Sequence, residues 1–196
     1  IWGGERRIYA TLKFVLYTAF GSILVLAALI YLVLYTHGSS GYMTFDLRHL
    51  SGSQLPLNTQ LWLLSAFALS FAIKVPMFPL HTWLPDAHVE APTTGSVILA
   101  GVLLKMGTYG FMKLGFPLFP DATRLFTPAL MILSVVSIIY GACLALVQTD
   151  IKKIIAYSSI SHLGYVMLGL ASLDLIGIQG AILQMGLKKS EVTKIA

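Results

Sequence analysis

Long apolar runs separated by short polar segments dominate this chain. They cover about residues 12–35, 58–90, 93–114, 125–147, 154–171 and 175–187. A helix needs about 20 apolar residues to cross roughly 30 Å of hydrocarbon, and most of these runs have that length. None alternates apolar and polar residues in the way that strands of a membrane barrel do. The pattern predicts an all-α fold, a polytopic transmembrane helix bundle forming a single transmembrane domain over residues 1–196.

The second run is interrupted by prolines. Lys74 ends its first apolar stretch, and Val75-Pro76-Met77-Phe78-Pro79 follows directly. Each proline removes a backbone donor and clashes with the preceding turn, so we expect the helix to break at residues 75–79. Irregular backbone at membrane depth is tolerated only where it is buried in protein or lines a watery cavity, and transporters hold ions at such breaks. Pro76 and Pro79 therefore predict a functional, discontinuous helix.

Two lysines, Lys74 and Lys105, lie where hydrocarbon is expected. A charge at the bilayer centre costs at least about 2.5–3.5 kcal/mol on insertion scales, and its usual explanation is an ion or proton path inside a bundle. We predict that both lysines carry protons. The alternatives are that Lys74 extends to the membrane surface, and that Lys105 forms a static ion pair with a carboxylate on another helix.

His162 lies in the fifth run beside Ser158, Ser159 and Ser161. Imidazole suits a proton relay because it titrates near neutral pH. A neutral histidine that donates one hydrogen bond to a neighbouring helix is the alternative, and the sequence does not separate the two.

Four further polar residues follow the break: His81, Asp86, His88 and Glu90. The histidines are seven residues apart and would share a helical face, but without a third and fourth ligand they predict no metal site. Asp86 and Glu90 would serve either as a proton antenna or, more commonly for such residues, in helix capping and surface ion pairs. We treat all four as accessory residues.

Composition agrees with a membrane protein. The chain is 57% hydrophobic and 11% charged, against roughly 25% charged residues in soluble domains. Cys143 is the single cysteine, which excludes a multi-thiolate metal centre, and we expect it to be buried in its apolar run. No phosphate-binding, haem or dinucleotide motif is present, so we predict no cofactor and no redox chemistry in this chain.

The basic residues lie at the ends of apolar runs rather than in one patch, which argues against a nucleic-acid partner. If the first five runs each cross once, eight basic residues lie on one side and three on the other. The richer side holds Arg6, Arg7, Lys13, Lys152, Lys153, Lys188, Lys189 and Lys194. The positive-inside rule places that side, with the N-terminal segment and the loop at residues 150–153, in the cytoplasm or mitochondrial matrix.

Four segments resemble a known family. They are the stretch from Lys74 to Lys105, the stretch from Gln148 to Tyr165, Trp2-Gly3-Gly4, and Tyr17-Thr-Ala-Phe-Gly-Ser22. They closely resemble the subunit 4 (chain M) family of respiratory complex I, NADH:ubiquinone oxidoreductase. That family is antiporter-like and related to Mrp-type cation/proton antiporters.

The resemblance implies a proton-translocating membrane-arm subunit of that enzyme. Lys74 matches the family's lysine on its discontinuous helix, Lys105 the connecting lysine of the next helix, and His162 a histidine of the central hydrophilic axis. It also implies that NADH, FMN, iron–sulfur clusters and quinone bind in other subunits. The expected partners are other membrane-arm subunits, including antiporter-like neighbours, and the lipid bilayer. The expected location is the mitochondrial inner membrane or the bacterial plasma membrane.

The family pairs its first lysine with a glutamate on a helix that would precede residue 12, and adds a second half-channel after residue 187. We therefore expect a piece of a longer polypeptide, or a split subunit completed by a companion fragment, with the sixth run fading into its charged tail. Two other functions stay open: a stand-alone Mrp-type antiporter subunit and a structural remnant of the membrane arm.

Overall fold

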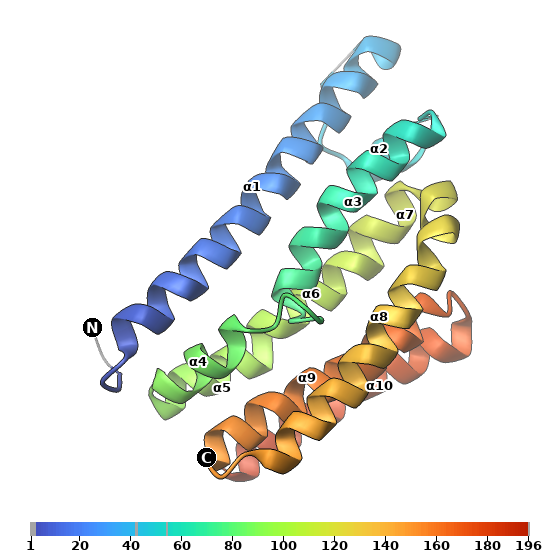
Figure 1. Cartoon of the computed structure of the whole chain (residues 1–196). Coiled ribbons are helices and arrows are strands. Elements are labelled where there is room, and N and C mark those ends of the chain that lie inside the picture. The colour runs from blue at the N-terminus through green and yellow to red at the C-terminus, as the bar shows by residue number, and fades with distance from the viewer. Residues whose placement is uncertain (1–2, 42, 54, 196) are drawn as a thin grey trace.

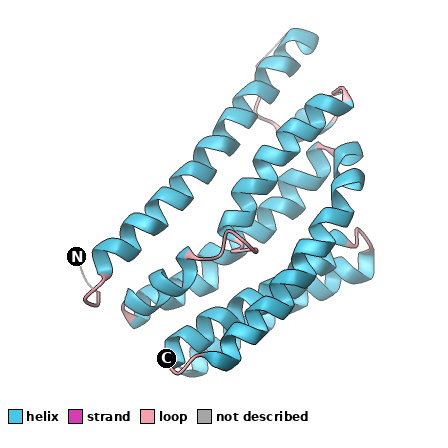
Figure 2. Cartoon of the chain, viewed as in Figure 1, coloured by secondary structure: helices cyan, strands magenta, loops and turns pink. Residues whose placement is uncertain are grey.

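The computed structural model describes residues 3–41, 43–53 and 55–195, with the side chains of residues 39, 40 and 187–195 left aside. All secondary structure in these ranges is helical (Figure 2), which confirms the all-α prediction. The helices are α1 (Arg7–Ser40), α2 (Leu47–Ser51), α3 (Leu57–Lys74), α4 (Trp83–Glu90), α5 (Thr93–Ile98), α6 (Leu104–Gly110), α7 (Phe116–Leu118), α8 (Pro120–Val147), α9 (Ile151–Ala171) and α10 (Leu175–Ile195), with π-helical segments η1 (Leu99–Leu103) and η2 (Phe111–Gly115).

Four helical stretches of the described chain are long and apolar enough to cross a membrane: Arg7–Gly38, Thr93–Leu118, Pro120–Val147 and Ile151–Ala171. α1 has 34 residues, so at about 1.5 Å per residue it extends well beyond roughly 30 Å of hydrocarbon. α3 stops after 18 residues, and the chain resumes as α4, which confirms the discontinuous helix. α10 is helical to Ile195, further than the expected fading at residue 187, although its apolar part ends at Gly186.

The helices lie roughly alongside one another (Figure 1). α1 lies next to α3 and α4, while α8, α9 and α10 form the opposite side of the bundle. The N-terminal segment, the end of α4 and the α8–α9 loop meet at one end. There the Gly4 N–H donates to the Glu90 carbonyl at 3.2 Å, and Lys152 Nζ donates to the Val89 carbonyl at 3.2 Å. The N-terminal segment and the 150–153 loop therefore share a side, as the charge pattern predicts.

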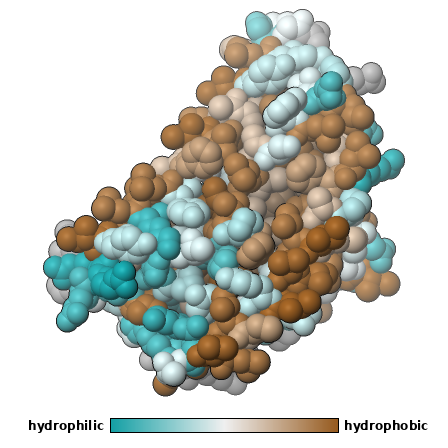
Figure 3. Space-filling model, viewed as in Figure 1, coloured by the Kyte–Doolittle hydropathy of each residue, from teal (hydrophilic) through white to brown (hydrophobic). Residues whose placement is uncertain are grey.

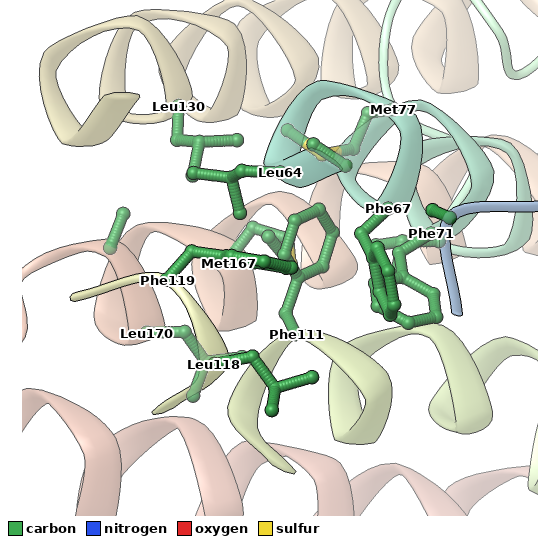
Figure 4. Packing of buried hydrophobic residues seen from close by; sticks show 14 of the residues in the cluster. Leu64, Phe67, Phe71, Met77, Phe111, Leu118, Phe119, Leu130, Met167 and Leu170 are labelled. Atoms are coloured by element: carbon green, nitrogen blue, oxygen red, sulfur yellow. The ribbon is translucent and has the colours of Figure 1, made fainter. Parts of the chain in front are cut away.

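Aromatic side chains fill the centre of the core (Figure 4). Phe71 contacts Phe67 and Phe111 with ring centroids 5.8 and 5.3 Å apart, and Phe67 contacts Phe119 at 5.6 Å, all edge-to-face. Such pairs contribute about 0.5–1.5 kcal/mol each beyond their area burial. The Phe71–Phe111 pair joins α3 to the span Thr93–Leu118, and the Phe67–Phe119 pair joins α3 to the residue that follows this span.

Glycines allow the helices to approach closely. A β-carbon at Gly141 of α8 would lie 2.8 Å from the Ser161 nitrogen of α9, and one at Gly164 would lie 3.0 Å from the Ser134 carbonyl oxygen. Helix pairs in membranes associate through such small residues because packing replaces the hydrophobic effect there.

Cys143, on the same helix α8, is exposed rather than buried as expected. An apolar residue on a membrane-crossing helix can face lipid as readily as protein, so the prediction for Cys143 was wrong.

The span Thr93–Leu118 is not the uniform helix that the sequence predicts over residues 93–114. Its hydrogen bonds shift register at η1, where the Leu104 N–H reaches back five residues to the Leu99 carbonyl. π-helical turns of this kind occur mostly as local insertions and often at functional sites. Lys105 is the second residue after η1, so this shift helps set its direction.

We predict that Gly107→Ala destabilises the protein and that Gly101→Ala does not. A β-carbon at Gly107 would lie 2.6 Å from Val75 Cγ2 and 3.1 Å from the Phe71 carbonyl oxygen, whereas one at Gly101 has nothing within 4 Å. Overpacking of this kind costs about 1–3 kcal/mol. Thermal unfolding in lipid nanodiscs should show a lower midpoint for Gly107→Ala alone, and equal midpoints for both variants would contradict the packing described.

Candidate functional site

The break between α3 and α4 satisfies its own backbone groups. A helix end leaves its last carbonyls without intrahelical partners, and in a membrane no bulk water replaces them. Here Val75 N–H donates to the Phe71 carbonyl at 2.8 Å, and Met77 N–H donates to the Ala72 carbonyl at 3.0 Å. The next carbonyl, that of Ile73, accepts a hydrogen bond from the buried Trp83 indole Nε1 at 2.8 Å. Trp83 thus ties the first residue of α4 back to the end of α3.

The irregular segment rests on α8. The Phe78 N–H donates to Ser137 Oγ at 3.0 Å, and the Tyr140 ring lies 5.1 Å from the rings of both Phe78 and His81. His81 is buried, and its Nδ1 has no hydrogen-bond partner among the described residues. Pro76 and Pro79 lie inside this segment, the latter after a cis peptide bond.

A polar seam joins α1 to α4 along the other face of the break. Lys13 Nζ lies 2.7 Å from Asp86 Oδ2 in an ion pair, and Tyr17 Oη lies 3.2 Å from Thr82 Oγ1. Between these two contacts, the Phe14 ring packs against the Trp83 ring, with the ring centroids 5.3 Å apart. The sequence pattern predicts only an orienting charge for Lys13, because it stands at the start of an apolar run; its ion pair with Asp86 is visible only in the structure.

The remaining accessory residues also make structural contacts. Glu90 Oε2 accepts a hydrogen bond from the Arg6 backbone N–H at 3.1 Å, and the His88 carbonyl accepts one from Ser96 Oγ at 3.2 Å. Asp86 therefore forms one of the ion pairs that the sequence favoured, and Glu90 binds the backbone just before α1. In the part of the chain that the structure describes, no three histidine, cysteine, aspartate or glutamate side chains converge on a metal position.

Lys105 and His162 line one small cavity between α6, α9 and α10. Its volume is about 20 Å³, and a water molecule needs roughly 10–15 Å³, so there is room for one water. The lining residues are Ala100, Leu104, Lys105, His162, Leu163, Val166, Gln184 and Met185. The structure thus brings together two of the predicted proton carriers from separate helices.

Gln184 of α10 completes this cavity. The Gln184 amide Nε2 lies 3.2 Å from His162 Nδ1. An amide N–H can only donate, so this pairing requires the His162 tautomer whose Nδ1 accepts and whose own Nε2 carries the proton. Beside it, Thr108 Oγ1 contacts the Lys105 carbonyl at 2.9 Å and Met185 Sδ at 3.0 Å. Sequence reasoning gave Gln184 no role, although an amide inside the apolar part of α10 was a usable signal.

Lys74 lies close to this site but does not line the cavity. It is the last residue of α3 and half-buried, and its β-carbon would be 3.0 Å from a β-carbon at Gly107, two residues after Lys105. Among the described residues, its ammonium group has no hydrogen bond or ion pair. The two lysines therefore lie on neighbouring helices at a similar level of the bundle.

Comparison with known proteins identifies the family of this chain. Residues 1–188 match the family described as NADH:quinone oxidoreductase/Mrp antiporter, transmembrane. The chain is 54% identical over 187 residues to NADH-quinone oxidoreductase subunit M of Rickettsia prowazekii, covering 94% of this chain and 37% of that protein. It thus spans little more than a third of the length of this relative.

Solved structures share the fold. A chain of respiratory complex I from Thermus thermophilus superposes with a TM-score of 0.83 at 38% identity, over 93% of this chain and 38% of that one. A chain of the Mrp complex from Dietzia sp. superposes with a TM-score of 0.76 at 23% identity, over 93% of this chain and 20% of that one. The second likeness concerns the fold alone.

We predict that Trp83→Phe lowers the free energy of unfolding by about 1–3 kcal/mol, because it leaves the buried Ile73 carbonyl without its donor. Trp62→Phe is the matched control, since Trp62 is 79% exposed and should change the free energy of unfolding by no more than about 0.5 kcal/mol. Thermal unfolding of both variants in nanodiscs checks this. Equal effects would mean that the indole N–H contributes nothing at the break.

Proposed function

The chain belongs to the NADH:quinone oxidoreductase/Mrp antiporter transmembrane family, and we propose that it conducts protons within a membrane-arm subunit of a respiratory complex I. It is an integral membrane protein of helical construction. Proton transfer through Lys105 and His162 is the central part of the proposal. Lys74 would deliver protons to them from the break after α3.

The observation that carries the proposal is the shared cavity of Lys105, His162 and Gln184. Two protonatable side chains line one small, partly open cavity with room for a water molecule, and they come from helices long and apolar enough to cross a membrane. An amine and an imidazole that share a cavity can exchange a proton through a water molecule between them. A purely structural core would place aliphatic side chains at these two positions.

Gln184 suits a histidine that changes protonation state. In the arrangement described, the Gln184 amide donates to His162 Nδ1. When His162 takes up a second proton, Nδ1 becomes a donor and needs an acceptor. A half-turn of the Gln184 amide presents its carbonyl oxygen instead, so one side chain supports both states of the ring.

In the proposal, Lys74 starts this sequence of proton transfers. Within the described residues its ammonium has no ion-pair partner, so a carboxylate brought near it from another segment would be its first countercharge. In the proposed cycle, a carboxylate from another segment approaches and leaves, and Lys74 gains and loses its proton accordingly. The redox reaction of the parent enzyme would drive that change from a distance.

The remaining parts of the proposal concern partners. NADH, FMN, iron–sulfur clusters and quinone would bind in other subunits, and this chain would contact other membrane-arm subunits, including antiporter-like neighbours. A companion polypeptide that completes the fold stays a prediction.

Complex I is favoured over a stand-alone Mrp-type antiporter because the sequence identity of this chain to the complex I relatives is 54% and 38%, against 23% for the Mrp chain.

We predict that Lys105→Ala leaves the parent complex assembled but lowers proton uptake at least about tenfold, a smaller loss than the roughly 10²–10⁴-fold that a positioned acid–base group contributes. Lys113→Ala is the matched control, because Lys113 lies on the same span, is exposed and does not line the cavity. NADH-driven proton uptake in inverted membrane vesicles, measured with a pH-sensitive dye, separates the two variants.

Other outcomes of that experiment select the alternatives. Full assembly with unchanged proton uptake in Lys105→Ala would point to a structural remnant of the membrane arm. Sodium-dependent proton exchange by a preparation that contains no redox subunits would point to an Mrp-type antiporter.

A further inference from the structure

A groove separate from the cavity of Lys105 and His162 opens where α1 begins and α4 meets α5. Its volume is about 210 Å³, far more than a single water needs. Arg7, Ala10 and Phe14 line it from α1, and Glu90, Pro92 and Leu99 line it from the other side.

The polarity of the groove changes along its length. Arg7 and Glu90 stand at the end of the molecule where Figure 3 shows hydrophilic residues gathered around the start of α1. Phe14 lies seven residues further along α1, or about 10 Å deeper at 1.5 Å per residue. Leu99 lies one to two turns inside the span that starts at Thr93. The groove therefore runs from a charged mouth to an apolar inner end, and with α1 crossing a membrane these ends would lie at the headgroups and in the hydrocarbon.

The two charged residues at its mouth have opposite signs. Glu90 uses one oxygen to accept the Arg6 N–H, and a carboxylate has about four lone-pair positions, so it can accept further donors. The Arg7 guanidinium matches a phosphate because two parallel N–H groups can bind it. Nearby, Lys152 donates to the Val89 carbonyl and adds positive charge beside the mouth.

We propose that this groove binds one phospholipid with an ethanolamine headgroup. The phosphate would bind Arg7, the primary ammonium would donate to Glu90, and an acyl chain would lie along Ala10, Phe14 and Leu99. A choline headgroup has no N–H to give to Glu90, and a glycerol headgroup has no positive charge for it. The proposal does not depend on proton transfer.

The test exchanges the intact membrane complex into nanodiscs that contain equal amounts of phosphatidylethanolamine, phosphatidylcholine and phosphatidylglycerol. Native mass spectrometry then counts the lipids retained after release into mild detergent. We expect the wild type to retain phosphatidylethanolamine preferentially. Arg7→Gln and Glu90→Gln should each lower that retention roughly tenfold, the equivalent of one charge-assisted hydrogen bond.

Matched variants separate lipid binding from folding. Glu90→Gln keeps an oxygen for the Arg6 N–H, so it should not disturb the fold. Leu99→Trp fills the apolar end and should also lower retention with both charges intact, whereas Arg48→Gln, away from the groove, should leave it unchanged. Wild-type retention in Arg7→Gln and Glu90→Gln, or a preference for phosphatidylglycerol, would overturn the proposal. So would a photo-crosslinker at position 99 that captures protein instead of lipid.

Discussion

The hydrogen bond from the Trp83 indole to the Ile73 carbonyl makes the broken helix possible. Inside a membrane every backbone carbonyl needs a partner from the protein, and a helix that stops at Lys74 exposes several of them. Backbone turns satisfy two, and the indole satisfies the third without continuing the helix. The same bond sets the position of α4, and so brings Asp86 within reach of α1.

The two halves of the discontinuous helix then serve different neighbours. α3 packs by its phenylalanines and by the Lys74–Val75 corner against the span that carries Lys105. α4 is held by α1 through the Lys13–Asp86 ion pair and the Tyr17–Thr82 contact. A break in one helix thereby separates the ion-paired polar seam between α1 and α4 from the small cavity that Lys105 and His162 line.

Much of the candidate site is readable from the sequence because hydrocarbon penalises charge so strongly. Lys74, Lys105 and His162 stand out in apolar runs for that reason alone, and the prolines mark the break. Gln184 and Lys13 were overlooked, since an amide is a weak signal and a lysine near a helix end normally serves orientation. Cys143 was misjudged because apolar character in a membrane helix does not distinguish a lipid-facing side from a buried one.

The sequence by itself determined the helical class, the approximate spans, the side shared by the N-terminal segment and the 150–153 loop, and the place of the break. These follow from local properties: run length, proline chemistry and the distribution of charge. Only the tertiary structure decided that Lys105, His162 and Gln184 meet in one cavity, that Trp83 closes the break, and that Lys13 holds Asp86. Those contacts join residues far apart in the chain, and they depend on helix rotation, on glycine-mediated approach and on the register shift at η1, none of which hydropathy encodes.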